Sequence, residues 1–137
     1  MKIINFVIPL FFIFFSAQLF AEIIEVNNNK IKELMEHGVP LIDIRTEKEW
    51  HNTGIINESK LLTFFDYEGN YNADKWIQEL GEIAGKNDPL IIICRSGRRS
   101  RIVSNLLEKK ANYVKIFHAT NGILSWIDSN NKTVKLE

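Results

Sequence analysis

The sequence predicts an α/β fold of three layers, in which a parallel sheet is flanked by helices. Short apolar segments suited to strands alternate with segments in which apolar residues recur at helical spacing. Residues 90–94 are apolar without alternation, which is typical of a strand covered on both faces. The length of 137 residues suits a single domain, and no linker-like stretch divides it.

The first half of the chain contributes three expected strands, at residues 22–26, 40–44 and 61–65. Asparagines at 27–29 can cap a helix between the first two strands, and Gly38 ends it. After the second strand, the Thr-x-x-Glu pattern at 46–49 is a capping box, which predicts a short helix that holds Trp50.

The second half contributes two more expected strands, at residues 90–94 and 113–117. Three helices are expected around them, at residues 72–83, after the loop that follows the single cysteine, and at residues 122–128. The turn signal Asn-Asp-Pro at 87–89 separates the first of these helices from the buried strand. We expect Trp50, Trp76 and Trp126 to pack in the core rather than to line a binding site.

The first 21 residues have the order of a secretory signal peptide. Lys2 precedes an apolar run at 3–15, and smaller residues follow up to Ala21, after which we expect cleavage. The alternative is an uncleaved membrane anchor over 3–20. Both carry the remaining domain, residues 22–137, across the membrane, so the expected location is the periplasm or the exterior.

Composition excludes several classes of protein. Lys plus Arg and Asp plus Glu both number 17, so no basic excess exists to hold nucleic acid. The single cysteine, Cys94, rules out an intramolecular disulfide and a multi-cysteine metal cage. His37, His51 and His118 lack ligand spacing, so neither a metal nor a cofactor is expected.

Cys94 stands at the end of the most apolar strand and is the candidate nucleophile. In open α/β sheets, ligands bind at the carboxyl ends of strands. The loop that follows has Gly97 for a tight turn and three arginines, which match the geometry of small oxyanions. Helix N-termini and nearby arginines favour the ionised, reactive form of a thiol.

The stretch 41–126 resembles a single-domain rhodanese, a sulfurtransferase that carries sulfur as a cysteine persulfide. Residues 41–45 and 49–50 are similar to its first motif, an aliphatic pair, Asp-Val-Arg and a later Glu before an aromatic residue. Residues 94–99 match the active-site loop Cys-Arg-x-Gly-x-Arg/Thr at every specified position. Residues 121–126 resemble the closing Gly-Gly-Ile/Leu-x-Ala-Trp motif. The motifs occur in the family's order.

The resemblance implies that Cys94 takes the outer sulfur of thiosulfate, releases sulfite and passes the sulfur to cyanide or a thiol. The implied partners are a small anionic sulfur donor and a thiophilic acceptor, which can be a protein thiol, with membrane contact only if the first segment is kept. The backbone of residues 94–99 would cradle the persulfide. The implied substrate-binding residues are Arg95, Ser96, Gly97, Arg98 and Arg99. Among these, Arg95 and Arg99 would attract the donor, and Arg98 would be exposed. Asp43 and Arg45 match structural positions.

Two other functions stay open. One is a thiol phosphatase or arsenate reductase of the Cdc25-like type, whose fold is similar. The longer His-Cys-x5-Arg loop of those enzymes has its arginine at the position that Ser100 occupies here. A non-enzymatic binding module of the rhodanese type usually lacks the cysteine. Two departures from the family do not touch Cys94: Asn121 replaces a glycine, and the family's histidine after the acidic–aromatic pair is missing, so His51 is expected on the surface.

A loop over the site is expected after the second motif. This fold often places such a loop near the nucleophile, and Phe64 or Phe65 is the candidate to line the pocket.

Overall fold

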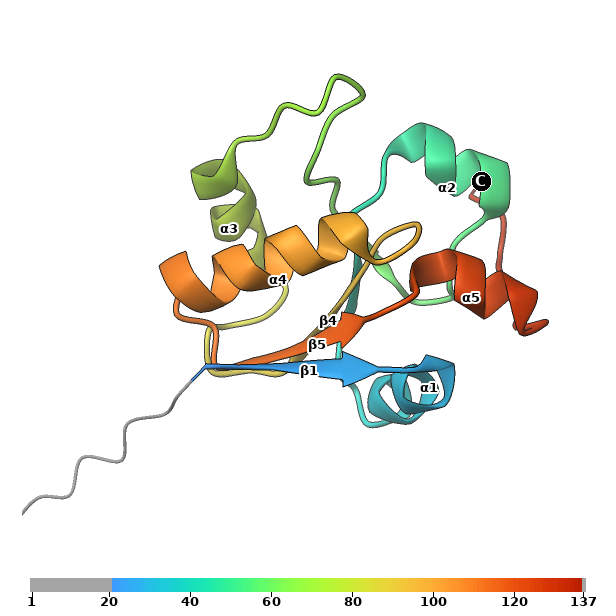
Figure 1. The fold of residues 1–137 in the computed structure, drawn as a ribbon, viewed down its shortest axis with the longest axis horizontal. Coiled ribbons are helices and arrows are strands. Elements are labelled where there is room, and N and C mark those ends of the chain that lie inside the picture. Colours follow the sequence, from blue (N-terminus) through green and yellow to red (C-terminus); the bar gives the residue numbers. More distant parts are fainter. Residues whose placement is uncertain (1–20, 137) are drawn as a thin grey trace, which may run out of the picture.

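A five-stranded parallel sheet with helices on both faces confirms the predicted fold class (Figure 1). The computed structural model describes residues 21–136. The strands are β1 (Glu22–Val26), β2 (Leu41–Asp43), β3 (Lys60–Leu61), β4 (Leu90–Ile93) and β5 (Lys115–Ala119). The helices are α1 (Asn28–Glu36), α2 (Glu47–Thr53), α3 (Ala73–Gly81), α4 (Arg98–Lys110) and α5 (Gly122–Asp128). Across the sheet the order is β1-β5-β4-β2-β3, so β4 is central.

The sheet separates two apolar cores. Figure 1 shows α3 and α4 above the strands and α1 below them. Trp76 of α3 and Leu107 of α4 pack on one face, and Ile31 of α1 and Trp126 of α5 pack on the other. All four residues of β4 are fully buried, because this strand is covered on both faces. The chain that follows β4 therefore starts from a rigid, dry position.

The expected caps at the starts of α1 and α2 are present in the structure, whereas α3 is shorter than the expected 72–83. The side chain of Asn27 accepts a hydrogen bond from the backbone N–H of Lys30 at 3.0 Å and caps α1. Thr46 and Glu49 form the predicted capping box at the start of α2. The three tryptophans are each less than 10% exposed, as expected for core residues.

Four of the five strands differ from their expected bounds, β2 by one residue at each end, β4 by one residue at its last position, and β3 and β5 by more. β3 ends at Leu61 instead of residue 65, although the N–H of Phe64 still donates to the carbonyl of Ile44, the residue after β2, at 3.2 Å. β5 begins at Lys115 instead of residue 113, because the N–H of Tyr113 bonds to the carbonyl of Leu107 and closes the end of α4. The apolar residues in both stretches are typical of strands, but local hydrogen bonds set where the strands begin and end.

The predicted signal segment, residues 1–21, lies outside the described residues except for Ala21. β1 begins at the next residue, Glu22. Among the residues that the structure describes, no helix combines the length and the apolar character needed to cross a membrane.

Asp43 and Arg45 form a buried ion pair that ties the end of β2 to α2. Both residues are about 1% exposed, and the guanidinium meets the carboxylate at 2.7 Å. Arg45 also donates to the hydroxyl of Thr53 at 2.7 Å and to the carbonyl of Gly54 at 3.0 Å. The pair thus fixes the helix that carries Glu49 against the sheet.

Replacing Arg45 with Ala should lower the free energy of unfolding by about 3 to 5 kcal/mol, because Asp43 would stay buried without its partner. Urea unfolding of the 22–137 chain measures this change. The control is Lys30→Ala, which breaks an exposed ion pair with Glu33 and should leave the urea midpoint unchanged. Equal effects of the two substitutions would contradict a structural role for the buried pair.

Candidate active site

Cys94 lies at the carboxyl end of β4, where a short loop leads into α4. Cys94 is about 1% exposed. The turn needs Gly97, whose φ of 100° lies in the left-handed region. A Cβ atom at Gly97 would also overlap the carbonyl oxygen of Thr120. The loop is therefore pressed against the chain that links β5 to α5.

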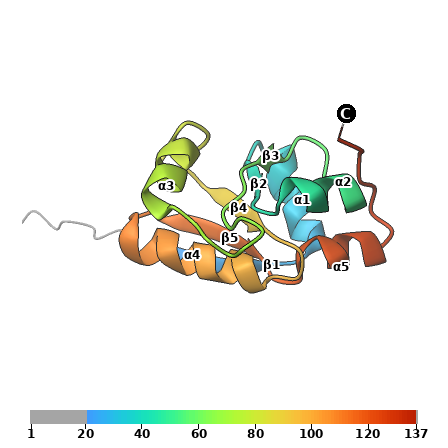
Figure 2. The same cartoon turned by 90° about the horizontal axis from the view of Figure 1, so that it is seen from above.

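The start of α5 holds this loop in place, and Figures 1 and 2 show the two segments side by side. The N–H of Ile123 donates to the carbonyl of Cys94 at 2.9 Å, and the N–H of Leu124 donates to that of Arg95 at 3.1 Å. A Cβ atom at Gly122 would overlap the Arg95 carbonyl. The cysteine loop and the closing motif of the sequence thus form one unit.

Hydrogen-bond donors gather around the sulfur of Cys94. The backbone N–H of Gly97 donates to Sγ at 3.1 Å, and that of Ser100 does so at 3.3 Å. The Ser100 hydroxyl also lies 3.3 Å from Sγ. N–H groups at the start of a helix stabilise a negative charge, so this arrangement suits a thiolate. Ser100 lies beyond the stretch 94–99 that the sequence marked as the cradle.

A cavity of about 520 Å³ opens beside the loop and contains four of the five predicted substrate-binding residues. They are Arg95, Ser96, Arg98 and Arg99. The first three are exposed, and Gly97 is buried beneath them. Lys48 adds a fourth cation to the lining, whereas Glu49 and Asp66 supply two carboxylates. The cavity therefore favours a small anion.

Arg99 is engaged by Glu49. Its two terminal nitrogens meet the two carboxylate oxygens at 2.9 and 2.6 Å, a bidentate pair that joins α4 to α2. Arg95 and Arg98 form no ion pair within residues 21–136. Of the two arginines expected to attract a donor, Arg95 has its charge available, and Arg99 shares its charge with Glu49.

The Glu49 carboxylate is held in its ionised form. Partial burial raises its pKa, but the hydrogen bond from Arg99, the bond from the Thr46 backbone and the charge of Arg99 together lower it to about 2. At any pH well above 2, the negative charge of Glu49 therefore offsets the positive charge of Arg99.

A buried hydrogen-bond chain behind the sulfur was missed by the sequence analysis, which gave His118 no role. Its Nε2 lies 2.9 Å from the Ser100 hydroxyl, and its Nδ1 lies 2.9 Å from the carboxylate of Glu25. His118 occupies β5, beside β4, and alternates with Phe117 and Ala119 of the opposite core. A histidine among the apolar residues of a strand was the available signal.

The two phenylalanines and His51 that the sequence singled out do not line the cavity beside the cysteine loop. Phe64 is buried in the core beside Trp76, and Phe65 lines an adjacent hollow with Arg98, Arg99 and Ile102. His51 is on the surface, as expected. Within residues 21–136, no group of three or more His, Cys, Asp and Glu side chains could hold a metal ion.

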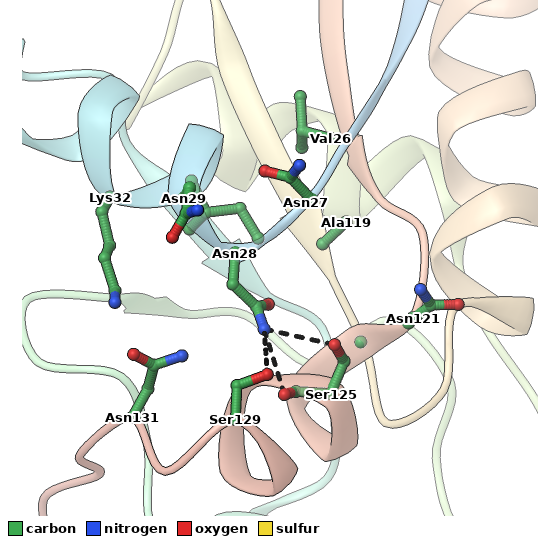
Figure 3. Close-up of a pocket in the computed structure, with 12 residues that line it drawn as sticks. Val26, Asn27, Asn28, Asn29, Lys32, Ala119, Asn121, Ser125, Ser129 and Asn131 are labelled. Carbon is green, nitrogen blue, oxygen red and sulfur yellow. Dashed lines mark hydrogen bonds between the residues drawn. The ribbon is translucent and has the colours of Figure 1, made fainter.

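A second cavity, of about 350 Å³, lies between α1 and α5 and is lined largely by asparagine and serine side chains (Figure 3). Asn28 donates to the carbonyl and hydroxyl of Ser125 and to the hydroxyl of Ser129, at 3.0 to 3.2 Å. Lys32 is the one charged residue of its lining. These bonds join α1 to α5 and so support the helix that holds the cysteine loop.

Comparison with known proteins assigns the fold and its loop to a family. Residues 27–129 match the family described as "Rhodanese-like domain". The chain belongs to the rhodanese-like family. A curated relative, thiosulfate sulfurtransferase 18 of Arabidopsis thaliana, is 24% identical over 112 residues, which cover 78% of this chain and 80% of the relative.

Solved structures agree with the rhodanese-like fold. A rhodanese-like domain protein from Staphylococcus aureus has a TM-score of 0.56 at 25% identity, over 75% of this chain and 90% of that one. A polysulfide-sulfur transferase homodimer from Wolinella succinogenes has a TM-score of 0.63 at 14% identity, over 84% and 80% of the two chains. The family and the curated relative support a role of the sulfurtransferase type.

Replacing Glu49 with Gln should make the free energy of unfolding depend less on pH in the acidic range. Because the folded pKa of Glu49 lies below its usual 4.5, its contribution is complete above about pH 4.5 and is lost as pH falls toward about 2. The wild type should therefore be more stable than the variant at pH 6, and the difference should shrink in acid.

Urea unfolding at a series of pH values measures that difference. Glu47→Gln is the matched control, because Glu47 lies on the same helix with an exposed side chain. A difference between wild type and Glu49→Gln that stays constant down to pH 2 would contradict the assigned role of the Arg99 pair.

Proposed function

We propose that the chain is a sulfurtransferase that moves sulfane sulfur through a persulfide on Cys94. The donor is thiosulfate or a related small anion, and the acceptor is cyanide or a thiol, which can belong to a protein. The observation that carries this proposal is the position of Sγ, which accepts hydrogen bonds from the backbone N–H groups of Gly97 and Ser100 at the start of α4. The thiosulfate sulfurtransferase among the relatives supports the choice of donor.

The first step forms a new sulfur–sulfur bond. The thiolate of Cys94 attacks the outer sulfur of thiosulfate, the bond inside thiosulfate breaks, and sulfite leaves with the electron pair. The persulfide retains one negative charge, and backbone N–H donors of the loop stabilise it. In the second step the acceptor attacks the outer sulfur, and the Cys94 thiolate is the leaving group.

The charges around the cavity suit a dianionic donor. Arg95 and Arg98 are exposed at its edge, and Lys48 lies on the opposite helix. Such cations raise the local concentration of an anion, and the effect weakens as salt increases. Arg99 fixes the loop to α2 through Glu49 rather than presenting a free charge.

Incubation of the 22–137 chain with thiosulfate should add the mass of one sulfur atom, and cyanide should remove it. Intact-protein mass spectrometry measures both changes. Cys94→Ser, which is nearly isosteric, should show no gain while keeping the same thermal unfolding midpoint. Arg95→Gln should slow loading by thiosulfate about tenfold, because a steering charge is lost, and should leave loading by a neutral persulfide unchanged.

Absence of a sulfur adduct on folded protein with a free thiol would contradict the proposal. The next substrates would then be aryl phosphates and arsenate, which test the phosphatase or reductase alternative. Sulfur gain by the Cys94→Ser variant would place the chemistry at another residue and would also contradict the proposal.

We also propose that the domain works after export, in the periplasm or outside the cell. The order of charge, apolar run and small residues before Ala21 supports a cleaved signal. Cleavage there would leave every described strand and helix intact, because β1 begins at Glu22. Expression of the full chain in a bacterium should yield a periplasmic product that starts at Glu22. A product of full mass in the membrane fraction would favour the anchor, and one in the cytoplasm would contradict export.

A further inference from the structure

The sulfur of Cys94 is connected to the surface through a chain of hydrogen-bonding side chains. The Ser100 hydroxyl lies 3.3 Å from Sγ and 2.9 Å from Nε2 of His118. On the other side of the ring, Nδ1 faces a carboxylate oxygen of Glu25 at 2.9 Å. His118 and Ser100 are buried, whereas Glu25 is partly exposed. These hydrogen bonds connect the end of β4 with α4, β5 and β1.

Glu25 is anchored as an ionised acceptor. Burial raises its pKa, but hydrogen bonds from Thr120 and His118, the charge of His118 and a bond from Arg101 outweigh this and hold the pKa below its usual value. An ionised carboxylate can only accept hydrogen bonds, so Nδ1 of His118 carries a hydrogen. This leaves Nε2 as the ring atom whose protonation can change.

Two oxygen atoms lie within hydrogen-bond distance of Nε2. Besides the Ser100 hydroxyl, Nε2 lies 3.0 Å from the carbonyl oxygen of Gly97. A carbonyl only accepts, so an unprotonated Nε2 would place one lone pair against another. The Ser100 hydroxyl also lies 3.1 Å from the Gly97 carbonyl, to which it can donate. When a protonated Nε2 donates to that carbonyl, the Ser100 hydroxyl can donate to Sγ instead. Every hydrogen then has an acceptor.

We propose that Ser100 and His118 form a proton relay that keeps Cys94 in its thiolate form. The thiol proton passes to Ser100 Oγ while the Ser100 hydroxyl proton passes to Nε2 of His118. A thiol and a neutral imidazole become a thiolate and an imidazolium, with no change of oxidation state. His118 is a positioning residue that holds the proton. The relay's relevance to sulfur transfer rests on the proposed function, because the thiolate is the attacking group.

Other charged groups lie around the relay and form a constant background. They are Arg98, Arg99 and Arg101 of α4, Arg95 of the loop, and the buried pair of Asp43, at the end of β2, with Arg45. Arg99 is close enough to Cys94 for their charges to interact. None of these arginines changes in the two variants that break the relay, so their effect cancels in a comparison.

The test is a pH titration of thiolate absorbance near 240 nm in the full 22–137 chain. Cys94 is the single cysteine, so Cys94→Ser supplies the baseline. Ser100→Ala removes the hydroxyl and keeps the backbone N–H, and His118→Gln keeps a polar group without a titrating ring. Each should move the midpoint to higher pH by about one unit, which leaves about tenfold less thiolate below both midpoints.

Matched controls separate the relay from general disturbance. Ser104→Ala removes another buried hydroxyl of α4, one that forms no hydrogen bond within residues 21–136. His37→Gln removes an exposed histidine of α1. Both controls should titrate as the wild type does. Glu25→Gln, at a partly exposed position, gives a milder variant in case His118→Gln does not fold, and its midpoint should also rise.

The double variant Ser100→Ala, His118→Gln should shift no further than the larger single shift, because one relay is broken twice. Fully additive shifts would overturn the proposal, as would wild-type titration in Ser100→Ala and in a folded His118→Gln or Glu25→Gln variant. The titration needs no sulfur donor. Shifted midpoints in the variants of a protein that takes no sulfur would support the relay and refute the proposed function. Unshifted midpoints in the variants of a protein that does take sulfur would refute the relay and support the proposed function.

Discussion

The proposed active site depends on the hydrogen bonds that the sulfur of Cys94 accepts at the start of α4. Two backbone N–H groups, of Gly97 and Ser100, point at one atom that is almost fully buried. A buried sulfur anion is costly unless donors replace water, and here the donors come from the backbone itself. The charge that the proposed chemistry needs would therefore be stabilised by the path of the backbone rather than by a mobile side chain.

That path is maintained by contacts from several directions. Fully buried β4 fixes the residue before Cys94. The N–H groups of Ile123 and Leu124 donate to the carbonyls of Cys94 and of the next residue. Arg99 ties the far end of the loop to α2, which the buried Asp43–Arg45 pair fastens to the sheet. The three sequence motifs of the family thus meet at one loop, although they are far apart in the chain.

Much of this could be predicted from the sequence, because it rests on short-range patterns. The apolar stretch of β4, the capping box of α2 and the loop of Cys94 each follow from neighbouring residues. The pairing of Arg99 with Glu49 could not be predicted, since the two lie fifty positions apart and both had other roles available. His118 was missed for the same reason, because only the strand order places β5 beside β4.

The state of the sulfur at neutral pH is the central claim, and vibrational spectroscopy of the S–H bond tests it most directly. The chain has a single cysteine, so the Raman spectrum contains at most one S–H stretching band, and Cys94→Ser supplies the blank. Our account predicts that the band is absent from the folded protein at neutral pH and grows in as the pH is lowered. A full S–H band at neutral pH would show a neutral thiol and would contradict both the cradle and the relay.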